Sequence, residues 1–223
     1  MSNQLKFIDL FCGVGGFHQA FLKLNKDENK KLKSIEKKGE TYTPNQYVCV
    51  LASDNNKACQ ETYRENYMTK KFIKDHNQGI SYEFNDNICK ISKSITEAGD
   101  DFNIDNGPVS NFDIICAGFP CQPFSNSGKK KAFEDTRGTL FHDIMTLTRA
   151  YKPRFMFLEN VKHIKRVNGG NVYQTILNCL KEEGYMVHVN ELSPHQLGIP
   201  QQRERVIFSC IRKDIWLNVD DEN

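Results

Sequence analysis

The sequence predicts an α/β protein with a mostly parallel sheet. Short apolar runs typical of buried strands alternate along the chain with segments whose apolar residues recur at helical spacing. Unusual groups of residues, at 12–16, 53–55, 118–123 and 159–160, each follow a predicted strand. Ligands bind at the carboxyl ends of the strands in such sheets, so we expect a binding site along that edge.

The predicted elements are delimited by apolar content and by glycine and proline. The strand-like runs are residues 6–11, 47–52, 112–117, 155–158, 185–192 and 205–211. The helical runs are residues 17–24, 57–67, 139–151 and 172–183, with Pro153 and Gly184 ending the last two. Residues 25–46 are rich in Lys and Asn, and we expect a polar, solvated insertion there rather than a basic binding arm. Residues 68–85 are polar, and we expect them to be irregular.

Length and composition limit the classes of protein that need consideration. The chain has 223 residues, enough for one domain, 1–223, with a sizeable core. Its 30 basic and 28 acidic residues give a net charge of +2, which neither requires nor excludes a polyanionic partner. No apolar run is long enough to span a membrane, and no export signal is recognisable, so we expect a cytoplasmic protein without a membrane partner. The eight cysteines form no CxxC pair, which gives no support for a metal site and favours reduced, mostly buried thiols.

A glycine-rich turn follows the first predicted strand. Residues 12–16 read Cys-Gly-Val-Gly-Gly, and glycines there let a ligand approach the backbone closely. Asp54 follows the second predicted strand, where an acid commonly accepts hydrogen bonds from ribose hydroxyls. Together the two features suggest a cofactor that contains adenosine. The alternative is a tight turn with a helix-capping aspartate.

Cys121 lies between two prolines just beyond the predicted strand 112–117. This place directs the side chain toward the ligand edge, and the proline rings would fix its approach to a substrate. A nucleophilic role would require surroundings that favour the thiolate. The alternative is a structural turn that happens to contain a cysteine.

Glu159 follows the next predicted strand, so its carboxyl group and the thiol of Cys121 are expected to meet over one crevice. Such a pair suits nucleophilic addition with acid assistance. Arg203 and Arg205 alternate, which places both on one face of a strand. They could hold a nucleic-acid group or fix Glu159, or they could belong to an exposed strand face.

Five segments, in order, resemble the cytosine-5 DNA methyltransferases of bacterial restriction–modification systems. They are FIDLFCGVGGF (7–17), AGFPCQPFSNSG (117–128), RGTLFHD (137–143), FLENVKHI (157–164) and GIPQQRERVIF (198–208). The resemblance implies a Rossmann-like, S-adenosylmethionine-dependent methyltransferase fold with helices on both faces of the sheet. It also implies transfer of a methyl group from S-adenosylmethionine, leaving S-adenosylhomocysteine, to C5 of a cytosine in duplex DNA, without a metal.

The resemblance assigns a role to each matched position. The implied cofactor-binding residues are Phe11, Gly13, Val14, Gly15, Gly16, Asp54, Asn55, Asn87, Ile88, Pro120 and Leu140. Cys121 would add to C6 of a flipped-out cytosine while Glu159 contacts N3, and Asn160, Arg203 and Arg205 would shape the pocket. Residues 125–131 would form a loop that closes over DNA, in which Ser125, Lys129, Lys130 and Lys131 contact the nucleic acid.

The sequence departs from the family in two places. The family usually has an aspartate that contacts the adenine amino group, and here either Asn87 or, by a shift of one residue, Asp86 takes that place. After Ile211 the family continues into a target-recognition region and two further motifs, which residues 212–223 do not contain. We therefore expect a catalytic subunit that needs a second polypeptide, the alternative being a truncated gene or a shortened chain. The rival functions are an RNA cytosine-5 methyltransferase and a catalytically silent cofactor-binding fragment.

Overall fold

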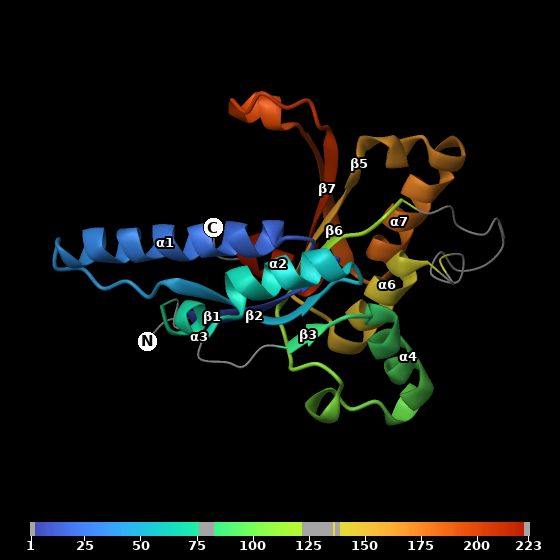
Figure 1. The fold of residues 1–223 in the computed structure, drawn as a ribbon, viewed down its shortest axis with the longest axis horizontal. Helices are drawn as coiled ribbons and strands as arrows, with labels where there is room; N and C mark the ends of the chain where they lie inside the picture. Colours follow the sequence, from blue (N-terminus) through green and yellow to red (C-terminus); the bar gives the residue numbers. More distant parts are fainter. Residues whose placement is uncertain (1–2, 76–82, 122–135, 137–138, 221–223) are drawn as a thin grey trace. The chain divides into compact units, whose positions relative to one another are not determined.

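The structure is a computed structural model that describes residues 3–75, 83–121, 136 and 139–220. Figure 1 draws its helices and strands, and the chain divides into two compact units. The first unit consists of Met1–Ile88 and Val109–Cys116, and the second of Cys89–Pro108 and Ala117–Asn223. Strand β4 (Ile114–Gly118) crosses the boundary between them.

The first unit is a parallel α/β arrangement. Its strands are β1 (Asn3–Leu10), β2 (Asn45–Ser53) and β3 (Glu83–Asn85), and β2 pairs in parallel with both of the others. Its helices are α1 (Gly16–Glu36), α2 (Lys57–Tyr67) and α3 (Lys70–Asp75). The inner parts of β1 and β2 are almost wholly buried, as expected for the continuous apolar runs of parallel strands. The order of strand, glycine turn, helix and second strand confirms the sequence prediction.

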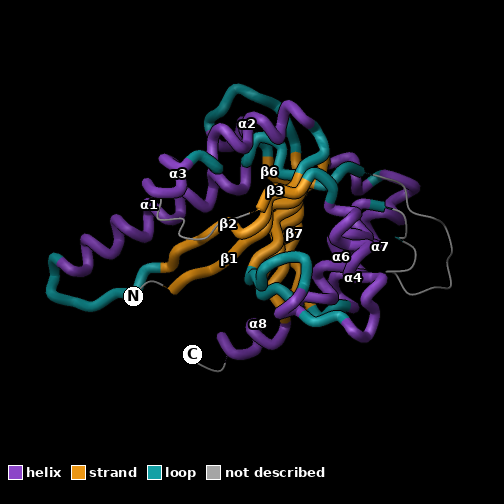
Figure 2. Tube along the Cα trace, turned by 60° about the horizontal axis from the view of Figure 1, so that its bottom comes forward, coloured by secondary structure: helices purple, strands orange, loops and turns teal. Residues whose placement is uncertain are grey.

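Helix α1 is much longer than predicted. The sequence suggested a helix over 17–24 followed by a solvated insertion, but the helix continues to Glu36 and runs alongside β1 and β2 (Figure 2). Asn25 explains why the extension is held: its side chain donates to the carbonyl of Tyr47 at 2.9 Å and accepts from the Tyr47 N–H at 2.7 Å. The prediction of an insertion over 25–46 was therefore wrong for its helical first part. The prediction of an irregular stretch over 68–85 was also wrong where α3 and β3 form.

Aromatic packing joins α1 and α2 to the start of the sheet. The ring of Phe7 stacks on Phe21 with centroids 4.4 Å apart, and His18 stacks on Tyr67 at 4.2 Å. The Nδ1 atom of His18 also lies 2.7 Å from the hydroxyl of Tyr63. These buried contacts fix the first turn of α1, and with it the glycine turn that leads into the helix.

The second unit contains an antiparallel part of the fold. Its helices are α4 (Ile88–Ala98, whose first residue belongs to the first unit), α6 (Leu140–Tyr151), α7 (Asn171–Glu182) and α8 (Lys213–Asp220), and its strands are β5 (Phe155–Val161), β6 (Tyr185–Leu192) and β7 (Arg205–Arg212). Strand β7 pairs antiparallel with both β5 and β6, so the fold is mixed rather than parallel throughout. The connection from β6 to β7 contains one short 3-10 turn (Pro194–Leu197) and no crossover α-helix of the kind that parallel neighbours need.

Local signals define the ends of α6 as predicted. The hydroxyl of Thr139 accepts a hydrogen bond from the N–H of His142 and caps the start of the helix. Lys152 then takes a left-handed conformation with φ 47°, and Pro153 follows. Among the residues that the structure describes, none of the helices combines the length and the hydropathy needed to cross a bilayer.

Candidate active site

Cys121 follows β4 in the second unit. After Gly118 the chain leaves the strand, Phe119 is buried and Pro120 is exposed, and Cys121 is half-buried. Five of the eight cysteines, Cys12, Cys49, Cys116, Cys179 and Cys210, are buried, as predicted for structural thiols. Cys121 differs from them because its side chain reaches the surface at a strand end.

Asn160 ties this turn to the neighbouring part of β5. Its side-chain amide donates to the carbonyl of Phe119 at 2.9 Å, and its carbonyl oxygen accepts from the N–H of Val161 at 2.8 Å. The side chain is only 2% exposed, so both bonds are shielded from water. The residue predicted to shape the pocket therefore positions the backbone two residues before Cys121.

Glu159 lies within β5 rather than after it, and an arginine from β7 holds its carboxylate. The Nε atom of Arg205 lies 2.5 Å from Oε1 of Glu159, and both side chains are half-buried. In the β5–β7 register Glu159 faces Ile207 and Arg205 faces Val161, so the pair is diagonal across the two strands. Of the roles left open for the arginines, fixing Glu159 is the one that Arg205 performs here. The expected meeting of Glu159 with Cys121 stays a prediction.

Arg203 does not share a strand face with Arg205, and that prediction was wrong. Strand β7 begins at Arg205, whereas Arg203 is exposed in an extended segment before it. The N–H of Arg203 donates to the hydroxyl of Ser193 at 3.4 Å, which holds the segment by a side chain instead of by strand pairing. Ser193 also forms a capping box with Gln196 at the 3-10 turn Pro194–Leu197. The sequence analysis missed Ser193, although a serine three residues before a glutamine is a recognisable capping pattern.

Electrostatics around Cys121 do not favour the thiolate in this state. Partial burial raises the pKa of the Cys121 thiol above its ordinary value. The surroundings that favour the thiolate, which a nucleophilic role would require, stay a prediction.

The glycine turn in the first unit has the backbone geometry that only a few residue types tolerate. Gly13 and Gly15 have φ of +54° and +93°, and Phe11 has φ of +54°. The turn closes through a hydrogen bond of 2.8 Å from the N–H of Gly15 to the carbonyl of Cys12. A Cβ atom on Gly15 would lie 2.3 Å from Cε2 of Tyr67, so this position requires glycine for space as well as for conformation.

Asp54 directly follows β2 and supports this turn. Its Oδ2 atom accepts a hydrogen bond from the N–H of Gly13 at 2.9 Å, and its Oδ1 atom accepts from the N–H of Asn56 at 2.8 Å. Each carboxylate oxygen has a second lone pair, so the half-buried group can still accept hydrogen bonds from a hydroxyl-bearing ligand. A Cβ atom built on Gly13 or Gly16 would meet no other described atom within 4 Å, which leaves the backbone there open to approach.

The other predicted cofactor-binding residues are divided between the units. In the first unit Val14, Asn55 and Asn87 are exposed, whereas Ile88 is 3% exposed at the first position of α4. Pro120 and Leu140 belong to the second unit. Asn85 ends β3 and its side-chain oxygen accepts from the N–H of Asn87 at 2.7 Å, an Asx-type turn that leaves the choice between Asp86 and Asn87 open.

Asp9 is a buried acid that the sequence analysis missed. It lies on β1 just before the glycine turn and is 0% exposed. Burial raises the pKa of this carboxyl well above its usual range, the nearby Asp54 adds to the shift, and the backbone of His18 offsets part of it. We therefore expect a neutral carboxyl group beneath the turn. The sequence gives no signal for this burial, because a single acid within an apolar strand can equally well be exposed.

Comparison with known proteins assigns the family. Residues 5–223 match the family model of C-5 cytosine-specific DNA methylases. The chain belongs to this family. It is 35% identical over 211 residues to the type II methyltransferase M.HhaI of Haemophilus parahaemolyticus, covering 95% of this chain and 50% of that protein. It is 32% identical over 220 residues to M.HpaII of Haemophilus parainfluenzae, covering 98% and 49%. The chain thus spans about half the length of these curated relatives.

Solved structures support the methyltransferase fold. A crystal structure of the S. pombe Dnmt2 methyltransferase matches with a TM-score of 0.57 and 21% identity, over 94% of this chain and 51% of that one. A putative DNA modification methyltransferase encoded within an E. coli prophage matches with a TM-score of 0.56 and 18% identity, over 95% and 47%. At these identities the likeness is one of fold.

The residues predicted to contact DNA lie outside the part of the chain that the structure describes. Ser125, Lys129, Lys130 and Lys131 fall outside the described residues, and their assignment stays a prediction.

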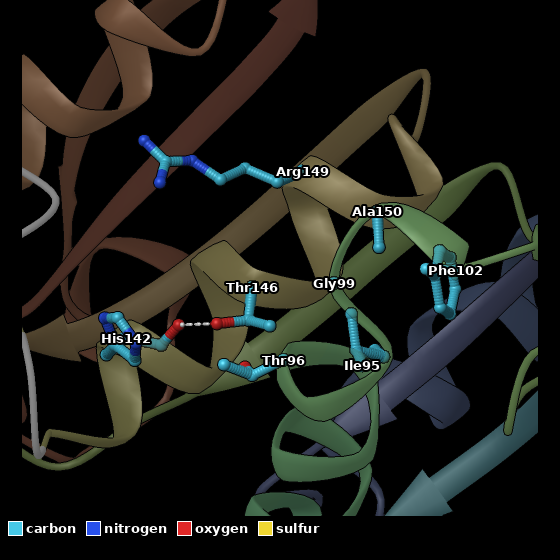
Figure 3. A pocket seen from close by; sticks show the side chains of 8 residues that line it. All are labelled: Ile95, Thr96, Gly99, Phe102, His142, Thr146, Arg149 and Ala150. Atoms are coloured by element: carbon cyan, nitrogen blue, oxygen red, sulfur yellow. Dashed lines mark hydrogen bonds between the residues drawn. The ribbon is translucent and has the colours of Figure 1, made fainter.

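A cavity of about 510 Å³ lies in the second unit, and none of the candidate site residues is among those that line it (Figure 3). It is lined by Ile95, Thr96, Gly99, Phe102, His142, Thr146, Arg149 and Ala150, from α4, α6 and the turn after α4. Figure 3 shows the guanidinium group of Arg149 pointing away from Phe102. Its Nε atom donates to Oε1 of Glu183 at 2.6 Å, so the charge is used in an ion pair and the cavity walls are mainly apolar.

Proposed function

We propose that this chain is the catalytic part of a DNA (cytosine-5-)-methyltransferase of a restriction–modification system. It would transfer a methyl group from S-adenosylmethionine to C5 of a cytosine in duplex DNA. The target base must leave the stack to reach a side chain on the protein, so the proposal includes base flipping. The observation that carries it is the anchored turn that presents Cys121 beside β5, where Arg205 holds Glu159 and Asn160 holds the turn.

The proposed chemistry begins at Cys121. After losing its proton to a base, the sulfur would form a bond to C6 of the cytosine, and the electrons of the C5–C6 double bond would move toward C5. Glu159 in its protonated form would donate a hydrogen bond to N3 and so offset the negative charge that develops on the ring. C5 would then bond to the methyl carbon as the bond between that carbon and the cofactor's sulfur breaks, which leaves S-adenosylhomocysteine. Loss of the C5 proton to a base would return the electron pair that re-forms the C5–C6 double bond and expels the sulfur of Cys121 as a thiolate. The ion pair with Arg205 would keep the carboxyl group of Glu159 in one orientation throughout.

The first unit supplies groups that fit S-adenosylmethionine. When bound, this cofactor supplies a methyl group on a positively charged sulfur. Gly13 and Gly16 would let it approach the backbone, and the carboxylate of Asp54 would accept hydrogen bonds from ribose hydroxyls. Phe11, Val14, Gly15, Asn55, Asn87 and Ile88 would complete the binding site in this unit, and the cofactor contacts assigned to Pro120 and Leu140 of the second unit stay a prediction. The open backbone and the spare lone pairs of Asp54 support this assignment.

We further propose that target recognition resides in a complementary polypeptide or in the remainder of a longer protein. The relatives are about twice as long as this chain, which supports a missing half. Three apolar side chains in the segment from the end of β6 toward β7 are unusually exposed: Leu192 at 46%, Leu197 at 72% and Ile199 at 53%. Apolar side chains gathered on one segment are typical of a surface that another protein part covers.

A covalent trap tests this function. A duplex that contains 5-fluorocytosine blocks loss of the C5 substituent, so the Cys121–C6 bond should persist after methyl transfer. We expect a DNA-linked product from the chain together with its complementary half and S-adenosylmethionine, and none from Cys121→Ala. Adduct formation by Cys121→Ala, or methylation of tRNA in preference to duplex DNA, would overturn the proposal. If adding the neighbouring gene product brings no gain in methylation, the split-enzyme part fails.

A further inference from the structure

Five lysines form a line along the outer face of α1. Lys23, Lys26, Lys30, Lys33 and Lys37 follow one another at spacings of three, four, three and four residues, with Lys37 at the C-cap. At 3.6 residues per turn, their Cα atoms fall within an arc of about 80° of the helix. All five side chains are exposed. We call this set the lysine stripe.

The opposite face of α1 is attached to the first unit, so the stripe must point away from it. Phe21 is buried, and Asn25 makes its two hydrogen bonds to the backbone of Tyr47. Leu32 and Ile35 are half-buried farther along the same helix. These contacts hold the helical extension along its length, and Figure 1 shows α1 as one continuous helix.

Acidic residues of the helix neutralise little of the stripe. Glu28 is turned toward β2, where its carboxylate accepts from the hydroxyl of Tyr42 at 2.7 Å and from the N–H of Asn45 at 2.9 Å. Asp27 lies 3.5 Å from Nζ of Lys30, a highly exposed pair that contributes little. Glu36 lies about 100° around the helix from the middle of the stripe. The outer face therefore concentrates positive charge in a chain whose total charge is only +2.

We propose that the lysine stripe binds the phosphate backbone of duplex DNA without regard to sequence. This goes beyond methyl transfer, and it rests on the proposed function only in naming duplex DNA as the polyanion. Successive lysines rise by about 4.5–6 Å along the helix, which long ammonium side chains can match to phosphates spaced by about 3.4 Å of axial rise on one strand. Lysine suits such contacts because its ammonium group acts as a flexible point charge. The stripe would supply affinity for DNA independent of the target site.

The experiment measures binding to a duplex made only of A·T pairs, which offers no cytosine to the catalytic residues. The stripe variant replaces its five lysines with glutamine. A control variant replaces five exposed lysines elsewhere, Lys71, Lys90, Lys93, Lys181 and Lys213, so that its net charge is the same. We expect the affinity of the stripe variant for the duplex to fall about tenfold or more at 0.1 M salt. The plot of log K against log salt should also become less steep, by about 0.9 in the magnitude of its slope for each lost phosphate contact. The control should keep the wild-type slope.

One further variant and one further ligand make the result decisive. Replacing the stripe lysines with arginine should retain the affinity for the duplex, because positive charge is kept, and circular dichroism verifies the helix in each variant. Equal slopes for the stripe variant and wild type, or equal losses in the stripe and control variants, would overturn the proposal. A larger loss for single-stranded RNA than for duplex DNA would overturn the choice of partner. Since the duplex lacks cytosine, failure of the Cys121 chemistry would leave these measurements unchanged.

Discussion

Arg205 reaches diagonally from β7 to β5 and places its Nε atom 2.5 Å from Oε1 of Glu159. Both side chains are half-buried, so the guanidinium group restricts the carboxylate to one direction without removing it from solvent. The register between β5 and β7 therefore sets the orientation of the Glu159 carboxylate.

Removing this pair should reduce turnover more than stability. We expect Arg205→Ala to lower kcat for methyl transfer by about 100-fold, because a misdirected catalytic group loses much of its effect. The free energy of unfolding should change by about 1 kcal/mol or less, as for other partly exposed ion pairs. Arg205→Lys should recover part of kcat, since it keeps the charge. Steady-state kinetics with urea unfolding separates the two effects, and Arg166→Ala, an exposed arginine of the same unit, serves as the control. A wild-type kcat in Arg205→Ala would refute the positioning role.

The raised pKa of Cys121 predicts slow alkylation at neutral pH. Burial favours the neutral thiol, so the thiolate fraction should rise about tenfold per pH unit and reach half its maximum above the ordinary value of about 8.5. Iodoacetamide labelling of the chain by itself, followed by peptide mass spectrometry, measures this titration at each cysteine. Cys89, whose pKa is raised to about 11 mainly by burial, gives an internal comparison, and the urea-unfolded chain gives the unshifted reference. A midpoint below 8.5 for Cys121 in the folded chain contradicts the prediction.

Asn160 should matter for both stability and the placement of Cys121. Asn160→Ala leaves the carbonyl of Phe119 and the N–H of Val161 without their buried partner, which should cost about 1–3 kcal/mol. Asn160→Asp keeps an acceptor for Val161 but loses the donor to Phe119. We expect its trapping by 5-fluorocytosine DNA to slow even at temperatures where the variant remains folded. If Asn160→Asp forms the adduct at the wild-type rate, the hydrogen bond to Phe119 does not position the turn.

The order of the helices and strands and the location of the candidate site could be predicted, because both depend on residues that are close together in the sequence. Apolar runs located β1 and β2, and the glycines after the first run located the turn, where Gly13 and Gly15 have positive φ. The segment around Cys121 was expected just beyond a strand, and in the structure Cys121 lies three residues after β4. In each case the residues that signal the feature are also the ones that form it.

The features that the sequence analysis did not predict depend on contacts between residues that are far apart in the sequence. Residues 25–36 have too few apolar side chains to predict a packed helix, and it is Asn25 and Glu28, through their bonds to the start of β2, that hold it. The alternation of Arg203 and Arg205 suggested one strand face, but the hydroxyl of Ser193 takes the N–H of Arg203 before the strand begins. Which arginine would meet Glu159 follows from the antiparallel register of β5 and β7, which the sequence analysis did not predict.

The glycine turn allows a graded test, since three glycines meet different constraints. Gly16 has ordinary φ and open space, so Gly16→Ala should leave stability unchanged or raise it by about 0.4–1 kcal/mol. Gly13 has open space but φ of +54°, so Gly13→Ala should cost about 1–2 kcal/mol from conformation alone. Gly15→Ala should cost more than either, because it adds contact of the new Cβ with Tyr67 to a φ of +93°. Urea unfolding of the three variants measures this order. Equal losses in Gly13→Ala and Gly15→Ala would mean that Tyr67 moves aside freely, and that the stacking of Tyr67 on His18 does not fix the turn.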